Sequence, residues 1–528
     1  MEYGPRLPNS RAGQSTRGGT ACDEHARLLE RNGFGEGRLV VDDAPTPVHL
    51  SNVLDGLAEN PALPAGLVRR LVRYRRGFGH VATRPDLTLD LIEEILASGH
   101  HWLLHSLALN PQLPNAVRMR LAAHADPAVR AALAARAHDA PRELYERLID
   151  DPDTRVREYL AEHDDVPADL LARLARDPDP KVRATLARWW TQAPEAVRRV
   201  LLTDPVNEVR AAACSTYYAR RPHPVPPSDL VTGLLADPVT RAGAVRHALL
   251  TPELAARLAD DPDYQVRRQV AEHPRLPPAV RDLLAGDPSA NVRVGVFGRR
   301  DTPEPTRHRI YEDIQQGERP LTDLLNDELD DAALLQQVED HMAVSELRNL
   351  RLDWVTANPL PYLSSPYICF RRSAARSRAL PAEAVIRLLN DDDNGVRTTM
   401  ATHAPHLVDP ATAERIDREF GPDKKTNWRP ADEFTFPPQT LRRLATDPDP
   451  RMRCLAPRDL DLPVELAERL ATDTESVVRH AVAGHPNLPV HVRRALLADP
   501  NDQVAHAAAA APALPVSEMD RLLTLAGV

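Results

Sequence analysis

The chain contains few aromatic residues and few cysteines. Phe, Trp and Tyr make up 4% of its 528 residues, which disfavours a β-sheet core rich in aromatic and β-branched side chains. Its cysteines, Cys22, Cys214, Cys369 and Cys454, are far apart and form no CxxC pair. Cysteines spaced in this way are expected to be reduced thiols, and they form no zinc or iron–sulfur motif. We therefore expect an all-α protein that holds no cofactor and no metal.

Long apolar runs and an excess of positive charge are also missing. No window contains about twenty consecutive apolar residues, and the N-terminal segment has no apolar core typical of a signal peptide. The formal net charge is -10, whereas nucleic-acid-binding domains usually carry a basic face. These absences predict a cytoplasmic protein, monomeric and away from membranes, for which nucleic acid is an unlikely partner.

Proline, by contrast, is abundant, with 50 residues spread along the chain, and it punctuates an internal repeat. In this repeat an Asp is followed by Pro at +1, an aliphatic residue at +5 and Arg at +6, and an apolar residue precedes a second Pro at about +16. Successive copies are mostly 26 residues apart, and about eighteen units cover residues 50–528. Complete copies begin at Asp151, Asp177, Asp204, Asp261, Asp287 and Asp447, with their arginines at Arg157, Arg183, Arg210, Arg267, Arg293 and Arg453.

Each unit is predicted to form two short helices. In "LPVELAERLATD", Pro463 lies in the first helical turn, and Leu466 and Leu470 fall on one face. In "DPDPKVRATLA" we expect Asp177 to be the N-cap of the second helix, with Pro in its first turn. Neither helix is long enough to be stable alone, so the units must stack. The expected fold is a single elongated α-solenoid.

These tandem units, of the form "LPxxLxxxLAxDPDxxVRxxVAxHPxLP", resemble the leucine-rich repeat variant family. The resemblance implies a right-handed superhelical solenoid of 24–27-residue repeats. The spacing of six between Asp and Arg is also similar to HEAT repeats, which implies that the six Asp and six Arg above form a ladder of hydrogen bonds between neighbouring units. An archetype of the family carries an N-terminal cluster of four cysteines that binds an iron–sulfur centre. This chain has only Cys22 there, so no cluster is expected.

The departures from the pattern divide the chain. We expect a largely disordered arm over residues 1–45, a first array over 46–300, an acidic, degenerate or irregular insert over 301–343, and a second array over 344–528. Residues 301–341 hold twelve acids against three arginines. Such a run is usually a solvated face, and the alternative is that it docks a basic partner.

The same departures mark candidate binding residues, because stacking does not dictate them. Tryptophan, tyrosine and arginine are favoured at binding hot spots, although large side chains can also fill a wide gap between helices. The candidates are Trp189, Trp190, Tyr217, Tyr218, Trp354, Tyr362, Tyr367, Phe370 and Arg372.

Catalytic and metal sites find little support. The Asp/Arg pairs recur in every unit, whereas a catalytic group is needed once. His163, His273 and His485 fall at equivalent positions of different units, about 8–10 Å apart if the helices pack normally, and are expected to interact with helix C-termini. His101 and His105 could share a helix face, but no third ligand is identifiable. The sequence therefore predicts no catalytic residue and no metal ligand.

The favoured function is a non-enzymatic scaffold or adaptor that binds a protein or peptide on the solenoid surface. Its class of partner is inferred from the fold, which does not by itself dictate function. The alternative is a nucleic-acid-binding protein of the kind seen in HEAT-like DNA alkylation-repair glycosylases, which use aromatic and acidic residues in a basic groove. No motif of those enzymes matches here residue by residue.

Overall fold

The computed structural model describes residues 48–528, except 75–78, 215–223, 317–330 and 422–427. Every regular element in these residues is a helix, so the predicted all-α solenoid of short repeats is confirmed. No helix among them is long and apolar enough to cross a membrane. Residues 1–47, and with them the predicted N-terminal arm and Cys22, lie outside the described part of the chain.

In the six complete copies of the repeat, the second helix begins two residues later than the sequence predicted. Helix α12 (Pro180–Trp189) is capped by Asp179, whose side chain accepts the backbone N–H of Lys181 at 2.9 Å. Asp177 instead accepts the N–H of Asp179 in the preceding turn. The prediction that Asp177 is the N-cap is therefore wrong, because the first Asp of "DPDP" shapes the turn and the second caps the helix.

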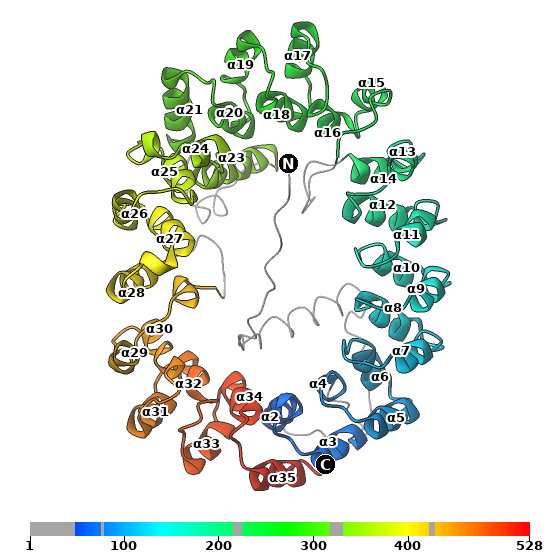
Figure 1. Ribbon diagram of the computed structural model, residues 1–528, viewed down its shortest axis with the longest axis vertical. Coiled ribbons are helices and arrows are strands. Elements are labelled where there is room, and N and C mark those ends of the chain that lie inside the picture. Colours follow the sequence, from blue (N-terminus) through cyan, green and yellow to red (C-terminus); the bar gives the residue numbers. More distant parts are fainter. Residues whose placement is uncertain (1–47, 75–78, 215–223, 317–330, 422–427) are drawn as a thin grey trace.

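Two concentric layers of helices make up the solenoid, as Figure 1 shows. The inner layer, in chain order, is α2 (Val48–Glu59), α4 (Gly79–Ala82), α6 (His101–Ala108), α8 (Pro127–Ala135), α10 (Thr154–Leu160), α12, α14 (Asn207–Ala213), α16 (Arg241–Val245), α18 (Tyr264–Glu272), α20 (Ala290–Phe297), α23 (Asp331–Asn349), α25 (Ile368–Ala375), α27 (Asn394–His403), the 3-10 helix η3 (Pro430–Glu433), α30 (Pro450–Arg453), α32 (Ser476–Val482) and α34 (Asp502–Ala510).

The outer layer contains the first helix of each unit. It consists of α3 (Ala65–Arg73), α5 (Leu89–Ser98), α7 (Asn115–Leu121), α9 (Arg142–Ile149), α11 (Ala168–Leu174), α13 (Glu195–Leu202), α15 (Val231–Ala236), α17 (Pro252–Ala259), α19 (Pro278–Leu284), α21 (Glu304–Gln316), α24 (Asp353–Ala357), α26 (Ala382–Leu389), α28 (Pro410–Arg418), α29 (Pro438–Leu444), α31 (Val464–Ala471), α33 (Val490–Leu497) and α35 (Val516–Leu525). Short 3-10 turns lie at η1 (Leu360–Tyr362), η2 (Pro405–Leu407) and η4 (Ala456–Arg458).

The two ends of the described chain meet, so the solenoid is a closed ring (Figure 1). Helix α2 packs against α34 and α35, and α3 packs against α35. Because α35 is an outer helix with no inner helix after it, and α2 is an inner helix with no described outer helix before it, the two together complete one repeat. The apolar core runs through this joint without a break, from Leu54 and Leu57 to Ala508 and Leu522.

Hydrogen bonds between turns show that the joint repeats an ordinary contact. The Asn110 side-chain amide donates to the carbonyls of Ala82 and Arg84, at 3.0 and 2.9 Å. The Asn60 amide donates in the same way to Ala509 and Ala511, at 2.8 and 2.7 Å. The last described unit therefore serves as the preceding neighbour of the first.

Closure corrects the expectation of an elongated array. About seventeen inner helices at a packing distance of about 9 Å trace a loop about 150 Å long, or roughly 50 Å across at the helix axes. Each repeat then needs to turn by only about 20° relative to the next repeat, a small rotation of the kind that gives solenoids their curvature. The sequence repeat predicts that the units stack, but it does not predict the angle between them.

Candidate functional site

Arginine–aspartate contacts connect neighbouring repeats along the ring. Arg183 Nη1 donates to the backbone carbonyl of Asp177 in its own unit at 2.7 Å, and its Nε donates to Oδ2 of Asp204 in the next unit at 2.7 Å. Most of these side chains are largely buried. The pairs, called rungs below, are Arg130–Asp151, Arg157–Asp177, Arg183–Asp204, Arg210–Asp237, Arg241–Asp261, Arg267–Asp287, Arg371–Asp391, Arg453–Asp473 and Arg479–Asp499.

The rungs differ from the sequence pattern at a few places. Arg293 Nη1 donates only to backbone carbonyls, those of Asp287 at 2.7 Å and Pro288 at 3.1 Å, and its Nε is buried without a hydrogen-bond partner. Asp447 accepts from Arg418 of the outer helix α28. Arg130 and Arg241 make rungs although the pattern missed them. The overlooked signal was an Asp-Pro-x-x-Arg spacing of four in place of six.

The predicted aromatic candidates near residue 360 form an interior cluster. The rings of Trp354, Tyr362 and Phe370 are 5.4–5.5 Å apart, and the Trp354 indole N–H donates to the Gly298 carbonyl at 3.0 Å. The Arg307 guanidinium lies over the Phe370 ring at 5.2 Å from its centroid. This cluster joins α20, α21, α24 and α25, and its geometry is that of packing.

Tyr367 and Phe370 are each 2% exposed. The Tyr367 hydroxyl donates to Glu304 Oε1 at 2.7 Å, and burial, together with this carboxylate, raises the pKa of Tyr367. A partner at the surface cannot reach either ring, so we leave both out of the candidate site. Asp301 and Glu304 of the acidic segment are likewise held in ion pairs, with Arg299 and Arg307.

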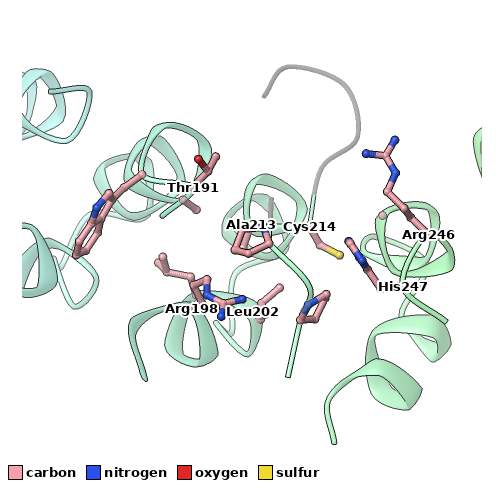
Figure 2. Close-up of a pocket in the computed structure, with 13 residues that line it drawn as sticks. Thr191, Arg198, Leu202, Ala213, Cys214, Arg246 and His247 are labelled. Atoms are coloured by element: carbon pink, nitrogen blue, oxygen red, sulfur yellow. The ribbon is translucent and has the colours of Figure 1, made fainter. Parts of the chain in front are cut away.

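Trp189 is the last residue of α12, Trp190 is its C-cap, and both are half-buried. Trp190 lines a small cavity of about 30 Å³ whose walls include Thr191, Cys214 and His247 (Figure 2). Tyr217 and Tyr218, predicted to lie beside the tryptophans, fall outside the described residues. The pairing of the two aromatic groups therefore stays a prediction.

Among the described residues that line this cavity are Cys214 and His247, and burial controls their protonation. It raises the pKa of Cys214 to about 12 and lowers the pKa of His247, which Arg246 lowers further. The thiolate is the reactive form of cysteine, so at neutral pH the pair consists of a neutral thiol and a neutral imidazole. The Cys214 carbonyl would lie 1.7 Å from a side chain at Gly243, which fits a packing role.

Several of the described histidines contact groups of a neighbouring unit, as His101 Nδ1 does with Asp126 Oδ2 at 2.6 Å. His485 Nε2 lies 2.9 Å from the Asp459 carbonyl of the preceding unit. His105 is 2% exposed. Within the described residues no group of three or more His, Cys, Asp or Glu side chains could hold a metal ion.

The inner layer carries a second, more open cavity, of about 300 Å³, across α10, α12 and α14. Its lining includes three acids and three bases that serve no rung: Glu158, Glu162, Glu208, Arg155, Lys181 and Arg188. Tyr159 adds a half-buried ring. Three successive repeats thus present a polar surface with one aromatic side chain.

The family comparison supports the nature of the repeat. The leucine rich repeat variant family matches residues 264–289 and 477–501. The resemblance to that family is confirmed. Both stretches run from the inner helix of one unit through the outer helix of the next and end near the following Asp.

No curated protein matches the chain. Among solved structures, a karyopherin, Kap121p, bound to the extreme C-terminus of the protein phosphatase Cdc14p is 12% identical over 91% of this chain and 55% of its own, with a TM-score of 0.22. An engineered protein is 15% identical over 89% of this chain and 99% of its own, with a TM-score of 0.12. This chain thus spans about half the karyopherin's length.

Proposed function

We propose that the protein is a non-enzymatic scaffold that binds a protein partner on the inner wall of the ring. The observation that carries the proposal is the cavity across α10, α12 and α14. Its charged side chains lie outside the rungs. Two of them have partners in the wall, Glu158 with Thr185 of the next unit at 3.2 Å and Arg155 with Asp153 at 3.0 Å, and the rung pattern dictates none of the six.

The chemistry of the cavity favours a protein surface over a small molecule. Ligand pockets are mostly apolar and enclosed, with few polar groups, whereas this cavity is polar, balanced in charge and shared by three repeats. Alternating Glu158, Arg188 and Glu208 beside Tyr159 offer the mix of charge and aromatic contact that protein interfaces use.

The buried Cys214 supports the non-enzymatic part of the proposal. Its thiol, with the pKa raised to about 12, is not a nucleophile at neutral pH. The Asp and Arg side chains of the rungs are engaged with each other between neighbouring repeats, so they are not free to act as an acid or a base on a substrate.

Affinity capture tests the proposal. The immobilised full-length chain is compared with a Tyr159→Ala/Arg188→Ala variant and with a matched control, Leu283→Ala/Arg173→Ala, on exposed positions of the outer layer. We expect at least one captured protein to be lost about tenfold or more with the inner variant and retained with the control. Capture that is equal for all three proteins, or absent for the wild type, would contradict inner-wall binding.

A further inference from the structure

Three arginines come together without a carboxylate where α23 ends beside α25. Arg372 lies on α25, Arg376 caps the C-terminus of that helix one turn later, and Arg351 follows α23. Arg372 Nη1 donates to Asn349 Oδ1 at 2.7 Å. Arg372 Nε and Arg376 Nη1 are buried and have no hydrogen-bond partner. In the part of the chain that the structure describes, no ion pair joins these three arginines to an acid.

The charges of Arg351 and Arg372 act on the guanidinium of Arg376. Burial first, and then the positive charges of Arg351 and Arg372, lower the pKa of Arg376. The contrast with α18 is informative, because Arg268 there is held by Glu272 and Glu346. A buried donor of an arginine without an acceptor is costly, so a cluster of this kind calls for an anion.

The repeat register places the arginines on the inner wall. Arg371 makes the rung to Asp391 just as Arg157 makes the rung to Asp177. Arg372 and Arg376 therefore correspond to the next residues in that register, Glu158 and Glu162. Both of those glutamates line the inner cavity of α10 and α12.

Arg372 is also fixed in position. A Cβ added at Gly395 on α27 would lie 2.5 Å from its Cζ, so the guanidinium rests directly on the helix backbone. Together with the bond to Asn349, this contact holds the fork of donors in place before any ligand arrives. Such preorganisation reduces the entropy lost on binding.

We propose that Arg351, Arg372 and Arg376 form a carboxylate-binding site for an acidic, extended segment of a protein partner. The inference rests on the proposed scaffold function and names the chemistry of its partner. Guanidinium groups bind carboxylates in a planar, two-pronged geometry. Side chains four residues apart on a helix are about 6 Å apart, and alternate residues of an extended peptide are about 6.6 Å apart, so acids at every second position fit Arg372 and Arg376.

A nucleic acid fits this surface less well. Sequence-tolerant binding of single strands uses aromatic rings on which bases stack, and the neighbouring rings of Tyr367 and Phe370 are buried. The net charge of -10 also opposes the approach of a polyanion from a distance, whereas a short acidic segment needs only the local positive charge.

The test is fluorescence anisotropy with a labelled (Glu-Ser)4 peptide and the full-length chain at low salt. The Arg372→Gln/Arg376→Gln variant should bind at least about tenfold more weakly. The control, Arg69→Gln/Arg73→Gln, removes two arginines at the same spacing on α3, where Glu94 pairs with both, and should bind within about twofold of wild type. Equal losses for both variants, or no binding by wild type, would overturn the proposal.

A variant that keeps the charge sharpens the result. Gly395→Ala should displace the Arg372 guanidinium and weaken peptide binding, whereas Gly484→Ala, where a Cβ meets nothing within 4 Å, should not. An unchanged affinity for Gly395→Ala would contradict the fixed-fork geometry. Tighter binding of an eight-residue oligo(dT), or displacement of the peptide by inorganic phosphate at equal anion concentration, would assign the site to another anion.

These readouts are independent of affinity capture. The carboxylate site fails if (Glu-Ser)4 does not distinguish the arginine variants, even when capture depends on Tyr159 and Arg188. The scaffold function fails if capture does not depend on the inner wall, even when the peptide binds at Arg372 and Arg376.

Discussion

The joint that closes the ring and an interior joint such as α10–α12 hold their helices together by different means. At α10–α12 the Arg157–Asp177 rung connects two neighbouring repeats. At α34–α2 no rung is possible, because Ala505 occupies the arginine position. The closing joint instead brings α2 so near to α34 that a Cβ at Gly56 would lie 2.3 Å from the His506 carbonyl.

The difference teaches that the rung is one of two ways to stack these repeats. Helices that approach closely through glycine and alanine gain dispersion contacts over a large area, and the turn amide of Asn60 supplies the hydrogen bonds. On the outer layer Arg70 adds bonds to the Val528 carbonyl, at 2.7 Å, and to Asp520. Close helix packing and turn hydrogen bonds can therefore hold two repeats together where a rung is missing.

The largest expected effect comes from a bulky side chain at the closing joint. Gly56→Leu adds four carbons where the His506 carbonyl and Ala509 lie, and overpacking of this kind costs at least about 1–3 kcal/mol. We expect the ring to open and the radius of gyration measured by small-angle X-ray scattering to rise. Gly66→Leu on α3, where a Cβ meets nothing within 4 Å, is the control and should leave the scattering unchanged.

Acid should weaken the rungs before it weakens the closing joint. Hydrogen bonds from Arg479 hold the pKa of Asp499, its partner in a rung, below the ordinary value. A carboxyl with a depressed pKa in the folded state stabilises the fold above its unfolded value, about 3.9, and loses that contribution as the pH falls through the lower folded value.

We therefore expect the urea midpoint to fall steadily as the pH is lowered below about 4. Circular dichroism at 222 nm follows this change. A midpoint that stays constant between pH 5 and pH 3 would contradict the assigned role of the rungs.

Removing a single rung should lower the stability of one joint and leave the ring closed. Arg183→Ala removes the partner of Asp204, a carboxylate that is 5% exposed, and breaking a buried pair in this way costs about 2–4 kcal/mol. Arg293→Ala loses only bonds to backbone carbonyls and should cost about 1 kcal/mol. Urea unfolding of the two variants measures the difference, and equal free energies would show that the carboxylate contributes nothing.

The finest comparison uses the turn amides. Asn60 and Asn110 are both buried and make the same two bonds, one pair across the closing joint and one pair inside the array. Each substitution by alanine should lower the free energy of unfolding by about 1–3 kcal/mol, and the two values should agree within about 0.5 kcal/mol. A negligible effect of Asn60→Ala would mean that the ends are not joined in solution.

Much of the fold could be predicted because it repeats. The 26-residue pattern indicated two short helices per unit and their stacking, and both are present. The identity of the capping Asp was wrong because two Asp residues compete for that role in "DPDP". Arg130 and Arg241 were missed because the turn before each helix is shortened.

Features set by three-dimensional geometry could not be read from the pattern. Ring closure depends on a small rotation per layer that accumulates over the whole array. Aromatic residues such as Phe370 departed from the repeat in sequence and resembled a binding surface. They fill the wider interior where the longer helices α21 and α23 replace the regular units.

Pulsed electron–electron double resonance, which measures the distance between two spin labels, tests ring closure most directly. Spin labels at Arg73→Cys and Leu525→Cys, in a background with the four native cysteines replaced by alanine, span the α3–α35 contact, and labels at Arg73→Cys and Ser98→Cys span the ordinary α3–α5 contact. Closure predicts two short, narrow distance distributions of similar mean and width. A long, broad distribution for the Arg73–Leu525 pair alone would show that the ring is open.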